Sequence, residues 1–294
     1  MANFYLNVDG RRTYVTDVGV GPTIVLLHGA AVGVDSTLTW FRTISELSQQ
    51  FRLVAFDQIG FGRTDMPLDG IYKNRLERTY HAESVLRELG ITAACLVGHS
   101  EGAFVAARLA ITTPDVARSL VIVTSGGTAP YLGGSKDEEW ISACEQAYND
   151  PNRLDSEASF VSSDPHLSRG PDHRYEMLLR ENFQRSVSSR QVEMFRAMPE
   201  AEVDYRKYRE LQETYILPYL SKVDVPSLLV WAGEDPTVPI SRGLALSELI
   251  PDADFQVIND SGHYVMHDQA AAFHDLLRVF AGGDRLHRTV GFRD

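Results

Sequence analysis

The chain is poor in cysteine and basic residues, and it contains no long apolar run. Two cysteines among 294 residues are too few for a disulfide framework. A net charge of −12, without a dense basic cluster, argues against a nucleic-acid partner. No apolar run approaches the length of a membrane span, so no membrane partner is expected. Residues 1–7 lack the charged and apolar regions of a secretory signal, and the expected compartment is the cytoplasm.

The most informative segment is residues 98–102, which read Gly-His-Ser-Glu-Gly. Strand-forming residues 93–97 lead into it, and the small-residue helical stretch 103–110 follows. A strand, a sharp turn and a helix form the context in which a nucleophilic serine is held clear of the backbone. The two flanking glycines lack a Cβ, which lets the strand and the helix approach closely. The segment therefore predicts Ser100 as a catalytic nucleophile.

Two further strand ends supply partners for this serine. The apolar run 226–233 reads as a buried strand and is followed by Asp235, and a second strand near the C-terminus leads to His263. An acid can orient a histidine and stabilise its charged form, while the histidine activates the serine. The chain order Ser100, acid, histidine is the order of the α/β-hydrolase fold. These residues therefore predict a Ser-Asp-His triad.

Two other acids compete with Asp235 for this role. Glu234 is adjacent to Asp235 and is expected to point elsewhere, whereas Asp260 lies three residues before His263 and is expected to shape the turn. The histidines are dispersed along the chain, and the pair His263 and His267 is better explained by the triad than by zinc. The sequence therefore predicts no metal site and no cofactor.

An expected oxyanion hole lies after the buried strand 23–27. His28-Gly29 follows this strand, as in hydrolases in which this loop donates one backbone N–H to the oxyanion. We assign the loop donor to Ala30, with Ala31 as the alternative, and the second donor to the backbone of Glu101. The side chain of His28 is expected to have a structural role.

The order of elements predicts one α/β domain with an insertion. Residues 4–18, with Asp9-Gly10, read as an antiparallel hairpin. Buried strands are expected near residues 23–28, 52–57, 93–98, 119–124, 226–232 and 254–259, and helices near 74–89 and 268–280. This alternation predicts a mostly parallel, eight-stranded sheet covered by helices on both faces. No strand is expected within residues 126–218, which predicts a helical lid between the core segments 1–125 and 219–294.

With these motifs in place, nearly the whole chain resembles the α/β-hydrolase superfamily, and most closely its meta-cleavage product hydrolases. The loop at residues 28–33, the segment 55–65 and the Gly-rich stretch 125–130 are similar to blocks of that family. The resemblance implies hydrolysis of a carbon–carbon bond in a 2-hydroxy-6-oxo-dienoate. The sharp turn at residues 98–102, here called the elbow, departs from the family pattern, because His99 and Glu101 stand where those enzymes usually have Asn and Met.

The resemblance also implies three substrate-binding residues. Arg180 is the match for the lid arginine that binds the substrate carboxylate, Thr39 matches a loop asparagine, and Tyr264 stands where the family usually has tryptophan. An intact triad also suits a carboxylesterase or a lactonase, and a non-catalytic small-molecule receptor can keep the same residues. The expected partner is a small molecule. The sequence specifies no oligomeric state and is compatible with a homodimer.

Overall fold

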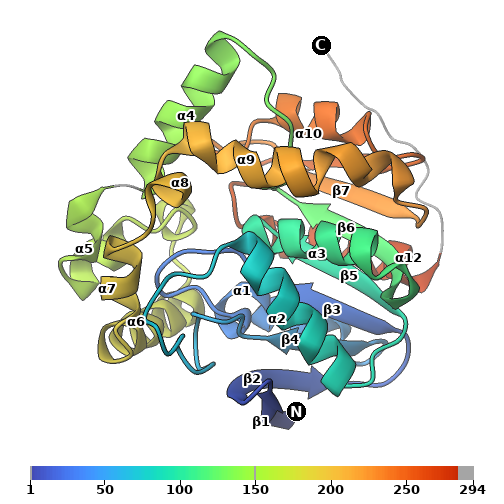
Figure 1. The fold of residues 1–294 in the computed structure, drawn as a ribbon, viewed down its shortest axis with the longest axis horizontal. Helices are drawn as coiled ribbons and strands as arrows, with labels where there is room; N and C mark the ends of the chain where they lie inside the picture. Colours follow the sequence, from blue (N-terminus) through green and yellow to red (C-terminus); the bar gives the residue numbers. More distant parts are fainter. Residues whose placement is uncertain (1, 149, 284–294) are drawn as a thin grey trace.

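An eight-stranded sheet forms the centre of the molecule in the computed structural model, which describes residues 2–148 and 150–283 (Figure 1). The strand order is β1-β2-β4-β3-β5-β6-β7-β8. The strands are β1 (Ala2–Val8), β2 (Arg11–Val18), β3 (Thr23–Leu27), β4 (Arg52–Phe56), β5 (Ala94–His99), β6 (Ala117–Val123), β7 (Ser227–Ala232) and β8 (Asp254–Ile258). Strands β3 to β8 pair in parallel, whereas β2 pairs antiparallel with both β1 and β4. The prediction of a mostly parallel eight-stranded sheet is confirmed.

The hairpin at the edge of the sheet follows from its turn residues. Asp9 and Gly10 both have positive φ angles, of 49° and 80°. Such a pair fits the two-residue turn whose twist matches that of the flanking strands. The predicted hairpin is therefore present, and its turn lies at the expected dipeptide.

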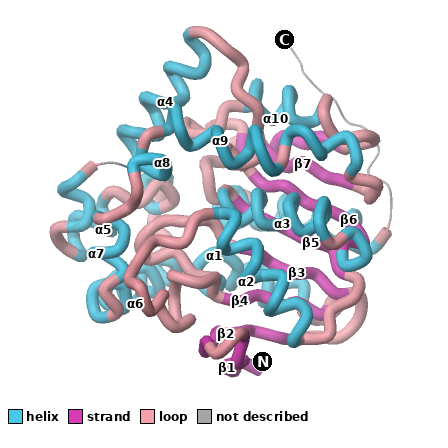
Figure 2. The backbone as a smooth tube through the Cα atoms, in the orientation of Figure 1, coloured by secondary structure: helices cyan, strands magenta, loops and turns pink. Residues whose placement is uncertain are grey.

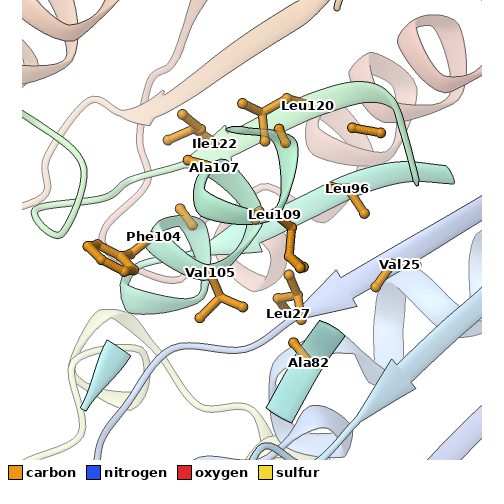
Figure 3. Packing of buried hydrophobic residues seen from close by; sticks show 14 of the residues in the cluster. Val25, Leu27, Ala82, Leu96, Phe104, Val105, Ala107, Leu109, Leu120 and Ile122 are labelled. Carbon is orange, nitrogen blue, oxygen red and sulfur yellow. The ribbon is translucent and has the colours of Figure 1, made fainter. Parts of the chain in front are cut away.

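Helices cover both faces of the sheet because the parallel strands are apolar on both sides. Val25 and Leu27 of β3 point into one core cluster, and Ile24 and Leu26 point into another. The first face carries α2 (Arg75–Glu88), α3 (Glu101–Thr112) and α10 (Ile240–Ser247). The second face carries α1 (Ser36–Leu47), α11 (Val265–Asp268) and α12 (Ala270–Gly282). Figure 2 shows α2 and α3 in front of the sheet, and Figure 3 shows residues of the first cluster between α3 and the strands.

Between β6 and β7 the described residues form helices and turns, with no strand. The helices are α4 (Ser135–Tyr148), α5 (Glu157–Ser162), α6 (His173–Ser188), α7 (Gln191–Arg196), α8 (Glu200–Val203) and α9 (Tyr205–Tyr215), with 3-10 turns at Pro151–Leu154, Leu167–Arg169 and Leu217–Lys222. In Figure 1 helices α4 to α8 lie beside and above one end of the sheet. Across the described ranges, no helix combines the length and the apolar character needed to cross a membrane.

Apolar contacts attach this helical segment to the core. Tyr175, Leu179 and Phe183 lie on one side of α6 and share a buried cluster with Val32 and Leu38 of the core. Their spacing of four residues places all three on one helical face. The segment therefore packs on the strand ends from which the candidate site residues project.

Candidate active site

Ser100 lies in a strained turn between β5 and α3. Its φ and ψ angles are 54° and −124°, a conformation that L-residues rarely adopt, and its N–H donates to the carbonyl of Val123 over 3.0 Å. The turn needs glycine on both sides. A Cβ on Gly98 would lie 2.3 Å from the carbonyl oxygen of Gly102, and one on Gly102 would lie 2.3 Å from that of Leu27. The strand and the helix are thus held at a distance that only glycine permits, with the serine at their junction.

Asp235 and His263 meet at the ends of β7 and β8. Nδ1 of His263 donates to Oδ2 of Asp235 over 2.6 Å. The other carboxylate oxygen accepts the N–H and the hydroxyl of Thr237, both at 2.8 Å, and the N–H of Val238 at 3.1 Å. Burial alone would raise the pKa of Asp235, but His263 and these donors lower it. The carboxylate therefore stays ionised beside the imidazole.

The two competing acids lie elsewhere. Glu234 forms an ion pair with Arg169 at 2.8 Å, and Asp260 occupies an exposed turn with a positive φ angle of 53°. The acid that contacts His263 is therefore Asp235.

His99 holds the backbone of His263, a role that the sequence analysis did not anticipate. Its Nε2 donates to the carbonyl of His263 over 2.8 Å, and the hydroxyl of Thr124 donates to the same oxygen over 3.2 Å. The two imidazole rings lie 4.7 Å apart. Complete burial lowers the pKa of His99 well below its usual value, so the ring is neutral and adds no second positive charge beside His263.

The expected oxyanion residues surround the serine. Ala30, Ala31 and Glu101 line the same cavity as Ser100 and His263. The backbone of Glu101 begins helix α3, where unpaired N–H groups and the helix dipole favour negative charge. The loop residues follow the end of β3, so the sheet positions the proposed loop donor, and helix α3 positions the proposed donor of Glu101.

His28 has a structural role, as expected. Its Nε2 accepts the backbone N–H of Gln58 over 3.0 Å, and its Nδ1 donates to the carbonyl of Gly29 over 2.7 Å. Burial lowers the pKa of His28 to about 4, so the ring is neutral near neutral pH. It therefore fixes the loop that carries Ala30.

A cavity of about 570 Å³ opens between the core and the helical segment, a size suited to a small organic ligand. The core lines it with Ala30, Ala31, Val32, Tyr72, Ser100, Glu101, Gly126, Gly127, Thr237, Val238 and His263. Residues from α4 to α9 supply the remainder: Trp140, Cys144, Tyr148, Asp150, Arg153, Leu154, Phe195, Arg196, Met198, Glu202, Val203, Tyr205 and Tyr208. The helical segment therefore lines its side of the cavity with mostly aromatic and apolar side chains.

Arg180 does not line this cavity. Its guanidinium forms ion pairs with Glu157 at 2.8 Å and Glu176 at 2.7 Å, and its side chain is 42% exposed. Arg153 and Arg196 are the arginines that line the cavity. Within the described residues Arg153 forms no ion pair, and its buried Nε has no hydrogen-bond partner.

Thr39 and Tyr264 also lie outside the cavity lining. The hydroxyl of Thr39 is buried and donates to the carbonyl of Asp35 within α1, over 2.9 Å. Tyr264 is buried behind the site, with its ring 5.1 Å from that of His99 and 5.8 Å from that of His263. In this arrangement Thr39 stabilises a helix, and Tyr264 packs against the histidines. The described residues contain no group of three or more His, Cys, Asp or Glu that could hold a metal ion.

The parallel sheet, the elbow and the acid–histidine pair define a class of protein. The chain belongs to the α/β-hydrolase family, because residues 22–270 match the family described as alpha/beta hydrolase fold. The protein is therefore an enzyme of that family.

Within this class, the proteins similar to this chain include meta-cleavage product hydrolases. The chain is 30% identical to 2-hydroxymuconate semialdehyde hydrolase from Pseudomonas sp. (strain CF600), over 92% of this chain and 90% of that one. It is 26% identical to 2-hydroxy-6-oxo-2,4-heptadienoate hydrolase from Pseudomonas putida, over 94% of each. The structure is similar to that of the meta-cleavage product hydrolase CumD from Pseudomonas fluorescens IP01, with a TM-score of 0.76 and 25% identity over 96% of this chain and 97% of that one. The resemblance read from the motifs is thus confirmed.

Proposed function

We propose that this enzyme hydrolyses a carbon–carbon bond in a 2-hydroxy-6-oxo-dienoate, with Ser100, His263 and Asp235 as its catalytic triad. The observation that carries the proposal is the hydrogen bond between His263 and Asp235, because His263 and the strained Ser100 line the same cavity. The similarity to 2-hydroxymuconate semialdehyde hydrolase and 2-hydroxy-6-oxo-2,4-heptadienoate hydrolase supports a substrate of this class.

The residues have separate roles in this reaction. The site first converts the dienol into its keto form, and His263 moves the proton. The Ser100 hydroxyl then adds to the ketone carbonyl while His263 takes its proton, and the backbone N–H groups of Ala30 and Glu101 bind the oxyanion. When the carbon–carbon bond breaks, the departing carbanion equivalent takes the proton from His263. Water then hydrolyses the acyl-enzyme by the same route.

Arg153 is our first choice for the group that binds the substrate carboxylate. It lines the cavity and forms no ion pair within the described residues, whereas Arg180 is engaged by two glutamates. A guanidinium matches a carboxylate with two parallel hydrogen bonds. Arg180 keeps this role as an alternative only if it exchanges its glutamate partners for the substrate.

A second candidate function is the hydrolysis of esters or lactones. The cavity lining includes the acidic residues Glu101, Asp150 and Glu202 in addition to its two arginines. Such a wall is less favourable for an anionic substrate than a purely basic one, which favours a neutral ester. The same triad would then act through a simpler acyl-enzyme cycle.

The decisive experiment measures turnover on a panel of aryl dienoates, aryl esters and lactones. We expect cleavage of dienoates by the wild type and a loss on the order of 10⁶ in kcat for Ser100→Ala, by analogy with serine-protease knockouts. Ketonisation is followed separately from cleavage, because it does not need the serine. Near-full cleavage by Ser100→Ala would refute the triad. Binding without turnover of any substrate would favour a receptor.

The choice between the arginines is tested by Arg153→Leu and Arg180→Leu. We expect Arg153→Leu to reduce kcat/KM for dienoates by about 10- to 100-fold and to leave an uncharged aryl acetate almost unchanged, since charge-assisted hydrogen bonds are worth about 1.5–3 kcal/mol. Arg180→Leu is the matched control and should have little effect on either substrate. A selective loss in Arg180→Leu alone would assign the carboxylate to Arg180.

A further inference from the structure

A buried ion pair lies directly behind the proposed oxyanion hole. The Glu101 carboxylate accepts hydrogen bonds from Nη2 of Arg78 on α2 and from the hydroxyl of Tyr208 on α9, the latter at 2.8 Å. Arg78 is fully buried, and the Glu101 side chain is 14% exposed. Glu101 therefore contributes a backbone N–H that is proposed to stabilise the oxyanion and a carboxylate whose negative charge would destabilise it.

This carboxylate presents a problem for the proposed reaction. A negative charge beside the developing oxyanion raises the barrier, and in a water-poor site the repulsion is stronger than in solution. Arg78 and Arg75 both lie on α2, and the Arg75 guanidinium stacks 3.6 Å above the ring of Tyr208. Two cations on α2 thus face the carboxylate at the start of α3, and Glu202 on α8 adds a second carboxylate nearby.

We propose that Arg78 is a positioning residue for the hydrolytic reaction, because it neutralises Glu101 and so allows the adjacent oxyanion hole to hold negative charge. The inference rests on the proposed function, in which Ser100 forms a tetrahedral adduct. Arg78 does not line the cavity. It acts on the reacting atoms through Glu101.

The surroundings of Glu101 determine how the site responds to pH. Burial alone would raise the pKa of Glu101, but Arg78 and Arg75 lower it below its usual value. The titratable and charged groups that face this carboxylate are Tyr72 before α2, Arg75 and Arg78 on α2, Glu202 on α8, and Tyr205 and Tyr208 on α9. Removing Arg78 leaves burial opposed mainly by Arg75, so the pKa of Glu101 rises. Glu101 is then neutral at low pH and becomes an uncompensated anion as the pH increases.

The test compares kcat/KM for 4-nitrophenyl acetate, an uncharged ester, in Arg78→Met, Glu101→Gln and the double variant. Each is expressed as a ratio to the wild type from about pH 5.5 to about pH 9, which cancels the pH dependence that the variants share with the wild type. We expect Arg78→Met to lose about 100-fold at high pH, equal to about 2.7 kcal/mol, and much less at low pH. The double variant should recover about tenfold or more of that loss and show no extra pH dependence.

Three controls separate electrostatics from folding. Arg78→Lys keeps the charge and should remain near the wild type. Arg242→Met removes another buried arginine, one paired with Asp137 at 3.2 Å, and should lower the thermal midpoint without adding a pH-dependent loss. Glu101→Gln alone gives the background against which the double variant is compared, and Arg78→Gln replaces Arg78→Met if the latter does not fold.

The outcomes distinguish a failure of the role proposed for Arg78 from a failure of the proposed function. Persistence of ester turnover in Ser100→Ala would refute the proposed function. With Ser100-dependent turnover established, an Arg78→Met defect that is independent of pH and as large on the Glu101→Gln background as on the wild type would overturn the role of Arg78. That result would make the ion pair a structural contact between α2 and α3.

Discussion

Replacing Asp235 with asparagine tests the proposed triad at a point where the structure fixes the orientation of the new side chain. Oδ1 of Asp235 accepts two backbone N–H groups, from Thr237 and Val238, and the hydroxyl of Thr237. Placing the amide NH₂ there would leave both N–H groups without an acceptor, at about 1–3 kcal/mol each. The asparagine oxygen therefore takes the Oδ1 position, and its NH₂ group faces His263.

This orientation reverses the hydrogen bond to His263. Nδ1 of His263, which donates to Asp235 over 2.6 Å, must instead accept from the asparagine amide. The imidazole proton then lies on Nε2, and a protonated Nε2 cannot accept the proton of Ser100. The wrong tautomer costs about 10⁴-fold in a serine protease, equal to about 5.4 kcal/mol of barrier. We expect a loss of this size in kcat/KM with little change in thermal midpoint.

The assay follows aryl acetate and dienoate turnover under saturating and limiting substrate. Asp260→Asn is the matched control, because Asp260 lies in an exposed turn near His263 and does not contact it. It should lose less than about twofold. Activity of Asp235→Asn within about tenfold of the wild type, or a larger loss in Asp260→Asn, would show that Asp235 does not orient the histidine.

Two further predictions concern stability. Gly102→Ala should either not fold or have a much lower melting temperature, because its Cβ would lie 2.3 Å from the Leu27 carbonyl oxygen. A melting curve like that of the wild type would contradict this close approach. His166→Gln should flatten the pH dependence of the thermal midpoint above about pH 6.5. Burial alone would lower the pKa of His166, but its bonds to Asp268 (2.5 Å) and Asp172 (3.1 Å) raise it. The stabilisation from His166 is therefore complete below the pKa that histidine has in the unfolded chain, and it is lost as the pH rises through the higher pKa of His166 in the folded protein. An unchanged slope would count against these bonds.

The sequence predicted the sheet and the residues at its strand ends because these depend on local patterns. Buried apolar runs predicted strands β3 to β8 to within about two residues at each end. The elbow at residues 98–102 predicted the strained turn, since only glycine tolerates the contacts on either side of Ser100. The order serine, acid, histidine followed from which strand ends carry polar residues.

The sequence could not predict which side chains reach the cavity from the helical segment. Arg153 and Arg180 are both arginines in helical stretches, but one lines the cavity and the other pairs with glutamates at the surface. The direction of each arginine side chain depends on how its helix is rotated about its own axis when it packs against the core. The sequence does not determine this rotation, because no strand pairing fixes the helical segment. Thr39 is buried for the same reason, because its helix turns this position inward.

Long-range polar contacts were likewise decided by the tertiary structure. Arg78 and Glu101 are separated by 23 positions, and Tyr208 lies 107 positions from Glu101, yet the three side chains meet behind the serine. No local pattern marks such a cluster, since each residue alone is typical of a solvated helix face. The sequence by itself determined the sheet and the order of the proposed catalytic residues, because hydrophobic periodicity and glycine sterics act within short stretches of chain. Only the packing of α2, α3 and α9 decided the charge around the oxyanion hole, because electrostatic interactions depend on distances in space and on exclusion of water.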